Sequence, residues 1–330
     1  MKKIVVISGA AGMSGNETVR KLLSKGYIIW AFDNFFASSI ESIADLLEHP
    51  NLKFFQYDLC NKTQMTALET EIKSSIEKET FELSFINYAA VVHTKYFYSP
   101  ESTFQVNVLG MKDFLSMAVR LKAGIFLNCS TSEVYSMASF KEGGVREDDT
   151  LMLVTAESSQ RTSYATGKLL TEFFMKEAVE KRQIKGCSIR FANVYSNDEL
   201  LPEHIIPYAI DTFLKGDTIK LLNNAKHTYR SFLHNYDSCD AVIALLETPS
   251  ALDGSVYNVG TDEEISILEL VKIIAKKTGR ENINIIYEGE RSADPLRRLL
   301  NTEKIRKNTK WKPKVSLNEG LDMCIATKKK

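Results

Sequence analysis

Short apolar runs alternate along the first 260 residues with segments whose apolar residues recur at helical spacing. The runs predict buried parallel strands at 3–8, 27–32, 52–57, 83–87, 124–129, 186–191 and 256–259. After the first strand, Val19, Leu22 and Leu23 share one helical face, and a longer helix opening at Pro100 carries Phe114 and Leu115 on its apolar side. This alternation predicts an α/β fold with a Rossmann-type doubly wound parallel sheet.

Beyond Ser196 the pattern is less regular. Helices are predicted at 202–215, 237–247 and 265–278, strands at 218–222 and 230–234, and a last helix ending near Thr327, anchored by 311–315. A chain of 330 residues can bury a large core and carry a second unit. We expect a dinucleotide-binding domain at 1–192, with 231–260 returning to it, and a smaller α/β substrate-binding lobe mainly at 193–330.

The balance of charge narrows the range of partners. Lysine and arginine number 42 and aspartate and glutamate number 42, so the formal net charge is zero and favours neither nucleic acid nor an anionic membrane surface. The five cysteines show no Cys-x-x-Cys pair or metal-ligand spacing, which predicts free thiols, no metal and a reducing cytoplasm. The apolar run after Met1 is broken by Ser8-Gly9 too early for a signal peptide, and no stretch has the length of a membrane span.

A glycine-rich turn joins the first strand to the first helix. Gly9 permits a sharp turn, Gly12 lets a diphosphate approach the backbone beside Met13, and Gly15 lets the helix pack closely on the strand. N–H groups at the helix start then bind the phosphates. The alternative for such a loop alone is a strand-to-helix turn without a ligand. Asp33, which ends the second strand, can accept hydrogen bonds from a ribose and would repel a 2′-phosphate, so NAD is favoured over NADP.

Further cofactor contacts are predicted along the same edge of the sheet. Asp58, which follows the third strand, either accepts the adenine amino group or caps the helix that begins near Lys62. Ala89 and Ala90 offer small side chains where a ribose and nicotinamide would pass. His93 follows them, and a lone histidine is more often structural. The expected cofactor residues also include Asn34, Leu59 and Asn107, the last of which needs a partner if it is buried.

Hydroxyls and a carboxylate gather where the fifth strand ends. Thr131, Ser132 and Glu133 lie at the carboxyl end of a parallel strand, where open α/β sheets bind ligands. Tyr164 and Lys168 are four residues apart and share a helical face, so the ammonium is expected to lower the pKa of the phenol towards neutral and enable acid/base catalysis. The Tyr-x-x-x-Lys spacing is common by itself and gains weight from this context.

A basic segment at 291–298 has two interpretations. It is either an ordinary solvated face or a clamp for a diphosphate, and we favour the clamp.

The glycine spacing, Asp33, Thr131 and Tyr164-x-x-x-Lys168 together resemble the extended short-chain dehydrogenases, the NAD-dependent nucleotide-sugar epimerase/dehydratase family. The resemblance covers nearly the whole chain, including 190–195, 257–260 and 311–313. It implies that NAD oxidises the sugar of a nucleotide-diphosphate sugar at C4. Tyr164 would then remove the hydroxyl proton, Thr131 would hydrogen-bond that oxygen and Lys168 would orient the ribose. Diphosphate or nucleotide contacts are implied for Asn193, Arg230 and Arg291. The family habit also implies a homodimer through the helices of Asn107 and Tyr164.

The run Ser-Thr-Ser-Glu-Val-Tyr at 130–135, which contains Ser132 and Glu133, is similar to that of UDP-glucuronate decarboxylases and GDP-mannose 4,6-dehydratases, in which the glutamate serves chemistry beyond C4. Arg161 and Arg298 also resemble the decarboxylases. We therefore expect dehydration or decarboxylation; a simple 4-epimerase, which needs no such carboxylate, is the alternative, and a non-catalytic NAD-binding scaffold is a remote one. Glu133 would otherwise point to solvent or pair with an arginine. Departures from the family pattern are Ser136 in place of a glycine and Met13-Ser14 in place of an aromatic-aliphatic pair.

Overall fold

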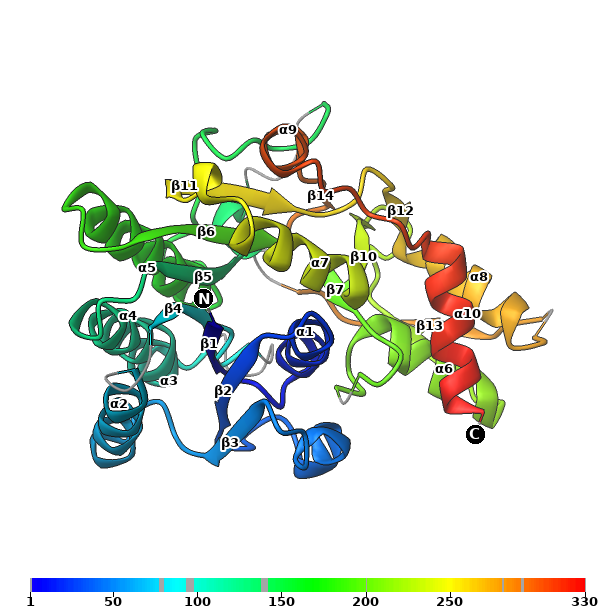
Figure 1. Ribbon diagram of the computed structural model, residues 1–330. Coiled ribbons are helices and arrows are strands. Elements are labelled where there is room, and N and C mark those ends of the chain that lie inside the picture. The colour runs from blue at the N-terminus through cyan, green and yellow to red at the C-terminus, as the bar shows by residue number, and fades with distance from the viewer. Residues whose placement is uncertain are drawn as a thin grey trace.

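A parallel sheet forms the centre of the molecule (Figure 1). The computed structural model describes residues 2–76, 80–92, 98–137, 142–199, 201–280, 282–291 and 294–329, and within them this sheet has seven strands in the order β11-β6-β5-β4-β1-β2-β3. Each neighbouring pair is parallel. The strands are β1 Lys2–Ser8, β2 Ile28–Asp33, β3 Leu52–Gln56, β4 Phe81–Asn87, β5 Ile125–Thr131, β6 Lys185–Phe191 and β11 Asp253–Val259. The predicted doubly wound fold is confirmed, and the strand order reverses at β1.

Helices cover both faces because side chains alternate between the faces along each strand. On one face Val5 and Ile7 pack with α1 (Met13–Ser24) and α7 (Asn235–Leu246). On the other face Ile4 and Val6 pack with the apolar sides of α2 (Lys62–Ile76), α4 (Met111–Arg120) and α5 (Thr162–Glu180). Figure 1 shows the two helical layers on opposite sides of the sheet. Strands buried on both faces explain why their sequences are continuous apolar runs.

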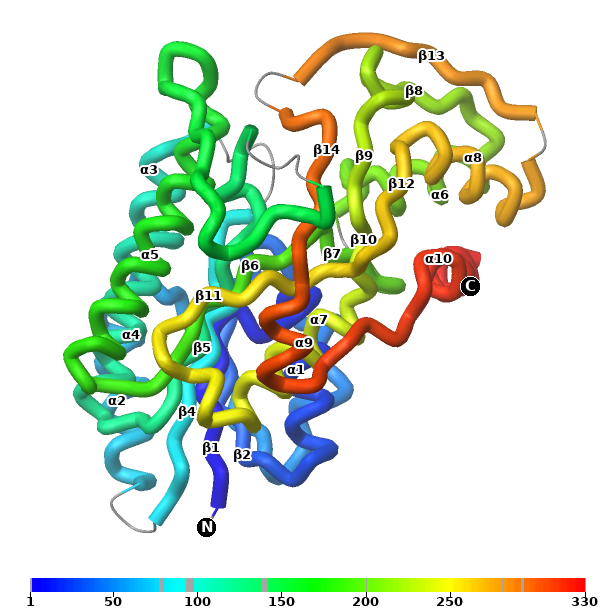
Figure 2. Tube along the Cα trace, turned by 90° about the horizontal axis from the view of Figure 1, so that it is seen from above, coloured from blue at the N-terminus to red at the C-terminus, as the bar shows by residue number. Residues whose placement is uncertain are grey.

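A smaller lobe has its own core. Helices α6 (Ile205–Lys215), α8 (Ile267–Lys277) and α10 (Leu317–Lys328) bury side chains such as Phe213, Leu270 and Leu321 against one another. Figure 2 shows this lobe to one side of the sheet, with β7 and β10 between the two. Its short strands are β7 Asn193–Tyr195, β8 Ile219–Leu221, β9 Tyr229–Arg230, β10 Phe232–His234, β12 Ile265–Ser266, β13 Ile285–Tyr287 and β14 Arg297–Arg298, and α9 (Glu303–Thr309) follows β14.

Local capping fixes where two of these helices begin. Ser266 is the N-cap residue of α8 and Ser316 is the N-cap residue of α10, and each forms a reciprocal capping box with the glutamate three residues later. Such a box satisfies backbone donors that a helix leaves unpaired at its start. The cap explains why the predicted helix at 265–278 is shorter than its apolar periodicity: the first two residues pair with β9 as strand β12.

Two further predictions are wrong in detail. The single strand expected at 230–234 is divided at Ser231 into β9 and β10, which belong to different sheets. The long helix opening at Pro100 is helical in the expected place, but only α3 (Pro100–Ser102) and α4 are α-helical. A π-helix, η4 (Thr103–Gly110), separates them. Both irregularities are shorter than the window over which hydrophobic periodicity is read, so the periodicity did not reveal them.

The segment at 311–315 lies against α7. The indole of Trp311 donates to the carbonyl of Asp237 at 3.0 Å, and the Asp237 carboxylate accepts from the backbone N–H groups of Lys314 and Val315. These contacts hold the chain just before α10. Among the described residues, no helix has the length and apolar character needed to cross a bilayer. The same residues contain no group of three or more His, Cys, Asp or Glu side chains arranged to hold a metal ion.

Candidate active site

The predicted cofactor and catalytic residues lie at the carboxyl ends of four adjacent strands. Gly9 follows β1, Asp33 ends β2, Ala89 comes shortly after β4 and Thr131 ends β5. Because these strands are parallel, all four ends lie at one edge of the sheet. The strand order, rather than the distance along the chain, therefore assembles the candidate site.

The glycine turn is built for close backbone contact. Gly9 has a φ of +68°, and a β-carbon there would lie 2.7 Å from the backbone nitrogen of Ala89. A β-carbon on Gly15 would lie 2.1 Å from the carbonyl oxygen of Gly9. At Gly12, by contrast, a β-carbon would meet only the Gly9 carbonyl, at 3.4 Å. Gly9 and Gly15 are thus required by packing, whereas Gly12 leaves space beside the start of α1.

The N-terminus of α1 suits an anion. Gly12 is its N-cap residue and contributes no side-chain cap, and the first turn, which includes Met13, holds no acidic residue. Unsatisfied N–H groups and the positive end of the helix dipole therefore face the space beside Gly12.

Asp33 is buried and already holds part of the surrounding backbone. Its carboxylate accepts from the N–H of Ala11 at 3.0 Å, the N–H of Phe35 at 2.8 Å and the hydroxyl of Ser38 at 3.0 Å. A carboxylate has about four acceptor positions, so one remains for a ligand hydroxyl. Asp33 thus ties the glycine turn to the loop after β2.

Of the two interpretations of Asp58, the one in which it caps the following helix is wrong. Asn61 caps α2 by accepting from the N–H groups of Thr63 and Gln64. Asp58 instead accepts from the N–H of Cys60 at 2.7 Å and from the side-chain amide of Asn34 at 2.9 Å. Asn34 and Asp58, two of the expected cofactor residues, are therefore in direct contact, and the adenine contact of Asp58 stays a prediction.

Asn107 has the partner that its burial requires. Its side-chain oxygen accepts from the N–H of Val91 at 2.7 Å and its amide donates to the Val91 carbonyl at 3.2 Å. This pair of bonds holds the loop after β4, which carries Ala89 and Ala90. Leu59 packs against Gly110 at the end of the same π-helix, where a glycine β-carbon would lie 2.9 Å from the leucine side chain. His93 lies outside the described residues.

Tyr164 and Lys168 are both buried on the first turns of α5. Thr131 hydrogen-bonds to the Tyr164 hydroxyl, which brings the candidate acid/base and its helper together. The Lys168 ammonium donates to the carbonyl of Cys129 at 2.8 Å, and burial lowers its pKa to about 8. Ser132 is buried in the single 3₁₀ turn that follows Thr131.

The expectation of a lowered tyrosine pKa is not met in this structure. Burial raises the pKa of Tyr164 above its ordinary value, and the negative charge of Glu133 raises it further. The Thr131 hydrogen bond acts in the opposite direction but is the smaller effect. The sequence pattern could not show that loss of hydration would be the largest influence on the pKa of this phenol.

Glu133 lies in a cluster of buried arginines. Arg161 donates to both of its carboxylate oxygens, at 3.2 and 3.3 Å, and Arg298 also donates to both, with Nη2 at 3.2 Å from Oε2. Burial raises the pKa of Glu133, but the charges of Arg298 and Arg161 outweigh burial and lower it to about 2. The interpretation of Glu133 as a solvent-facing group is therefore wrong, and its pairing with arginines is what the structure shows.

Asp294 extends this cluster from the lobe. Its carboxylate accepts from Arg230 at 2.8 Å and lies 3.7 Å from Arg161 and 3.9 Å from Arg291. Burial and the neighbouring charge of Arg298 lower the pKa of Arg230 to about 10. The Arg230 guanidinium has lost much of its hydration and lies near a second cation, so an anion bound at this site would be stabilised.

The charges of the cluster do not balance. Its three buried arginines, Arg161, Arg230 and Arg298, carry three positive charges, and the Glu133 and Asp294 carboxylates carry two negative charges, so without the half-exposed Arg291 the set has a net charge of +1. The Nε of Arg298 is buried and has no hydrogen-bond partner among the described residues. The cluster therefore has both the charge and a donor for one further anion.

The arginines of the segment at 291–298 differ in exposure, so the segment is not a uniformly solvated face. Arg298 is buried at the cluster, whereas Arg297 pairs with Glu264 and keeps 42% of its side chain exposed. Arg291 is 44% exposed. Asn193, the remaining expected diphosphate contact, is half-buried at the start of β7 and pairs in register with Phe232 of β10.

Sequence reasoning missed a second buried ion pair beneath the site. Glu172 accepts from two nitrogens of Arg190, at 2.9 and 2.7 Å, and from the hydroxyl of Ser130 at 2.6 Å. A signal was available, because Tyr164, Lys168 and Glu172 are spaced by four residues on one helical face and Arg190 interrupts an apolar strand. Asp294, in contrast, had no such signal in its irregular segment.

Comparison with known proteins gives consistent results. A family model described as GDP-mannose 4,6 dehydratase matches residues 6–324. UDP-glucuronic acid decarboxylase 1 of Arabidopsis thaliana is 26% identical over 326 residues, covering 98% of this chain and 69% of that protein. The dTDP-D-glucose 4,6-dehydratase of Bos taurus is 26% identical over 334 residues, covering 98% and 88%. The structure of UDP-glucuronic acid 4-epimerase from Bacillus cereus, in complex with UDP-glucuronic acid and NAD, matches the fold with a TM-score of 0.85 at 20% identity, covering 99% of each chain.

Proposed function

Since the chain belongs to the GDP-mannose 4,6-dehydratase family, we propose that it is an NAD-dependent enzyme that oxidises the sugar of a nucleotide-diphosphate sugar at C4 and then breaks a bond at C5. We assign cofactor binding to residues 1–192 together with 231–260, and nucleotide-sugar binding mainly to the remainder. The three relatives named above catalyse, by their names, three different reactions on such sugars. The choice among these reactions rests on the residues around Glu133.

The residues of this chain fit NAD. The open position beside Gly12, the uncapped start of α1 and the remaining acceptor of Asp33 suit a diphosphate and a ribose. Bound NAD supplies the hydride acceptor and, when oxidised, a positive charge that favours the tyrosinate form of Tyr164. The Asp33 carboxylate disfavours the extra phosphate of NADP.

Thr131, Tyr164 and Lys168 provide the proton chemistry. Tyr164 holds the proton that leaves the C4 hydroxyl, and Thr131 hydrogen-bonds to the tyrosine oxygen so that the phenol is oriented. Lys168 is fixed by the Cys129 carbonyl beneath them, where its ammonium can orient a ribose.

The single observation that carries the choice of reaction is the net positive charge of the buried cluster. We propose that the cluster binds the C6 carboxylate of a nucleotide-diphosphate hexuronic acid, with the unpartnered Nε of Arg298 as one donor. Once C4 is a ketone, the carboxylate is β to it, so the C5–C6 bond breaks, carbon dioxide leaves and the electron pair passes to the C4 oxygen. Protonation of C5 then gives a 4-keto-pentose, and return of the hydride to C4 would give the pentose. Decarboxylation is thus the favoured reaction.

Dehydration between C5 and C6 is the second candidate, because Glu133 lies next to Thr131 at the same edge. It is less favoured, since a carboxylate whose pKa is about 2 is a weak base towards a C5 proton. A 4-epimerase leaves C5 untouched and gives the cluster no role in bond breaking.

The test is product analysis in deuterated water with UDP-glucuronic acid, UDP-glucose, dTDP-glucose and GDP-mannose. Decarboxylation gives a product lighter by carbon dioxide with one deuteron at C5. Dehydration gives a product lighter by water with label at C5, and epimerisation gives an unlabelled isomer. Either of the last two as the main product would overturn the decarboxylase proposal.

Two neighbouring arginines on β14 provide a matched pair of variants for this test. Arg298→Gln removes a proposed donor to the C6 carboxylate of the substrate. It should raise the KM for UDP-glucuronic acid about tenfold to a hundredfold, which is the worth of a charged hydrogen bond. Arg297→Gln removes a half-exposed cation that pairs with Glu264 and should change the KM little. Equal effects of the two variants would contradict the assignment of Arg298.

A further inference from the structure

A buried polar contact joins α7 to the start of α1. Asn235, the first residue of α7, is 2% exposed, and its side-chain amide donates to the carbonyl of Met13 at 2.9 Å. The hydroxyl of Ser14 donates to the side-chain oxygen of Asn235 at 2.9 Å. Asn235 therefore contacts both residues that open α1, directly after the glycine turn.

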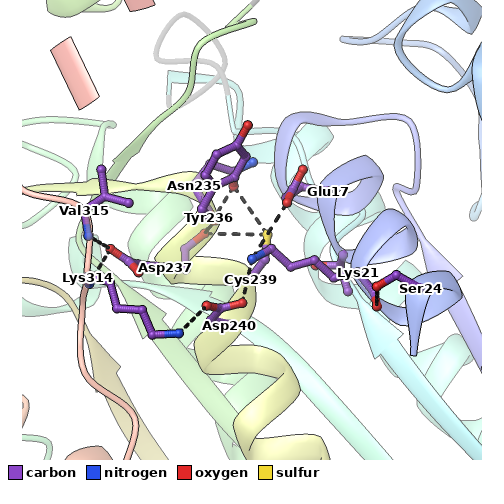
Figure 3. Close-up of polar contacts among 12 residues, drawn as sticks. Glu17, Lys21, Ser24, Asn235, Tyr236, Asp237, Cys239, Asp240, Lys314 and Val315 are labelled. Atoms are coloured by element: carbon purple, nitrogen blue, oxygen red, sulfur yellow. Dashed lines mark hydrogen bonds and ion pairs between the residues drawn. The ribbon is translucent and has the colours of Figure 1, made fainter. Parts of the chain in front are cut away.

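A second residue of α7 reinforces this contact. The thiol of Cys239 donates to the carbonyl of Ser14 at 3.4 Å, so the first two carbonyls of α1 each receive a donor from α7. The Ser238 hydroxyl lies 2.9 Å from the backbone carbonyl of Asn235 and 3.2 Å from its side-chain oxygen, and it can donate to either. Figure 3 shows Asn235 and Cys239 on the side of α7 that faces α1.

The pairing explains one departure from the family pattern. A serine at position 14 stands where an aliphatic residue is usual, and its half-buried hydroxyl needs a partner on α7. Asn235 is that partner. An apolar residue at 235 would leave the Ser14 hydroxyl without its acceptor and the Met13 carbonyl without this donor, so positions 14 and 235 depend on each other.

We infer that Asn235 is a positioning residue for the diphosphate-binding turn: held from behind by its amide, the first turn of α1 keeps its N–H groups directed at the cofactor. This inference rests on the proposed binding of NAD. The inference also connects the two proposed sites, because β10 joins Arg230 of the arginine cluster to Asn235 at the start of α7. The same stretch of chain thereby contacts the proposed substrate carboxylate site and the proposed cofactor site.

The experiment measures NAD binding to the purified full chain by calorimetric titration, together with thermal unfolding. Asn235→Val should raise the Kd for NAD about fivefold to fiftyfold, the worth of one or two buried hydrogen bonds. Asp240→Asn is the matched control, because Asp240 also joins α7 to α1, through Lys21 at 2.6 Å, but further along α1 from the turn (Figure 3). The control should alter the Kd by less than about threefold, as expected for a partly exposed ion pair.

Each outcome separates this inference from the proposed function. If the wild-type protein fails to bind NAD, or binds NADP as tightly, the proposed function or the role of Asp33 is wrong. If it binds NAD and Asn235→Val has the Kd of the Asp240→Asn control, the inference is overturned, even if the Tm falls. Should Asn235→Val not fold, Ser14→Ala removes only the hydroxyl contact, and an unchanged Kd for NAD in that variant equally refutes the inference.

Discussion

Replacing Glu133 by glutamine should strongly destabilise the protein, because it removes negative charge from a buried cluster while keeping the shape of the side chain. Glu133 receives hydrogen bonds from Arg161 and Arg298, and its loss would leave three buried arginines with Asp294 as their remaining counter-charge. Leaving a buried cation uncompensated is among the costlier changes in a protein interior.

The magnitude follows from the pKa. A fall from 4.5 to about 2 means that folding favours the ionised form by about 3 kcal/mol, since each pKa unit corresponds to about 1.4 kcal/mol. Because the pKa is lower in the folded protein than in the unfolded chain, this stability is fully present above about pH 4.5 and is lost as the pH falls towards 2. We therefore expect Glu133→Gln to lower the free energy of unfolding by about 3 kcal/mol at pH 7 and by progressively less below pH 4.5.

The assay is urea unfolding at pH 7 and at pH 4, followed by the fluorescence of Trp30 and Trp311. Glu264→Gln is the control: its carboxylate also pairs with an arginine, but Arg297 is 42% exposed, so the loss should be below about 1 kcal/mol. A Glu133→Gln protein that unfolds at the same urea concentration as the control would refute this account of the cluster. So would a difference from wild type that grows as the pH is lowered.

Two other predictions concern Tyr164 in α5 and Ser136, which directly follows the 3₁₀ turn that holds Glu133. Tyr164→Phe should lower kcat about a hundredfold to ten-thousandfold and leave the Kd for NAD unchanged, because it removes only the acid/base hydroxyl. Product formation and NAD titration measure the two effects, and wild-type turnover in this variant would exclude the mechanism. Ser136 has a φ of 47°, a region that favours glycine. Ser136→Gly should therefore raise the free energy of unfolding by about 1 kcal/mol in the same urea assay. A decrease would show that the serine side chain stabilises the fold by more than the backbone strain costs.

The sequence by itself determined the strands of the central sheet, the family and most of the candidate site residues. The cores of runs such as 4–7 and 125–127 are apolar at every position because parallel strands are buried on both faces, and this pattern is local. The glycine turn could be identified from its spacing. Gly15 is required by its contact with the Gly9 carbonyl within the same turn, whereas the structure shows that Gly9 is required by the backbone of Ala89 after β4. The family assignment, which rests on these motifs in order, is confirmed by the match over residues 6–324.

What only the tertiary structure decided is how charged groups from distant segments share one space. Glu133, Arg161 and Arg298 were each singled out, but their mutual pairing, the low pKa of Glu133 and the participation of Asp294 depend on the lobe lying over the end of β5. The raised pKa of Tyr164 likewise depends on burial, which no spacing of residues reports. The physical reason is that hydrophobic periodicity is a property of neighbouring residues, whereas solvation and Coulomb energies depend on distances that exist only once the chain has folded.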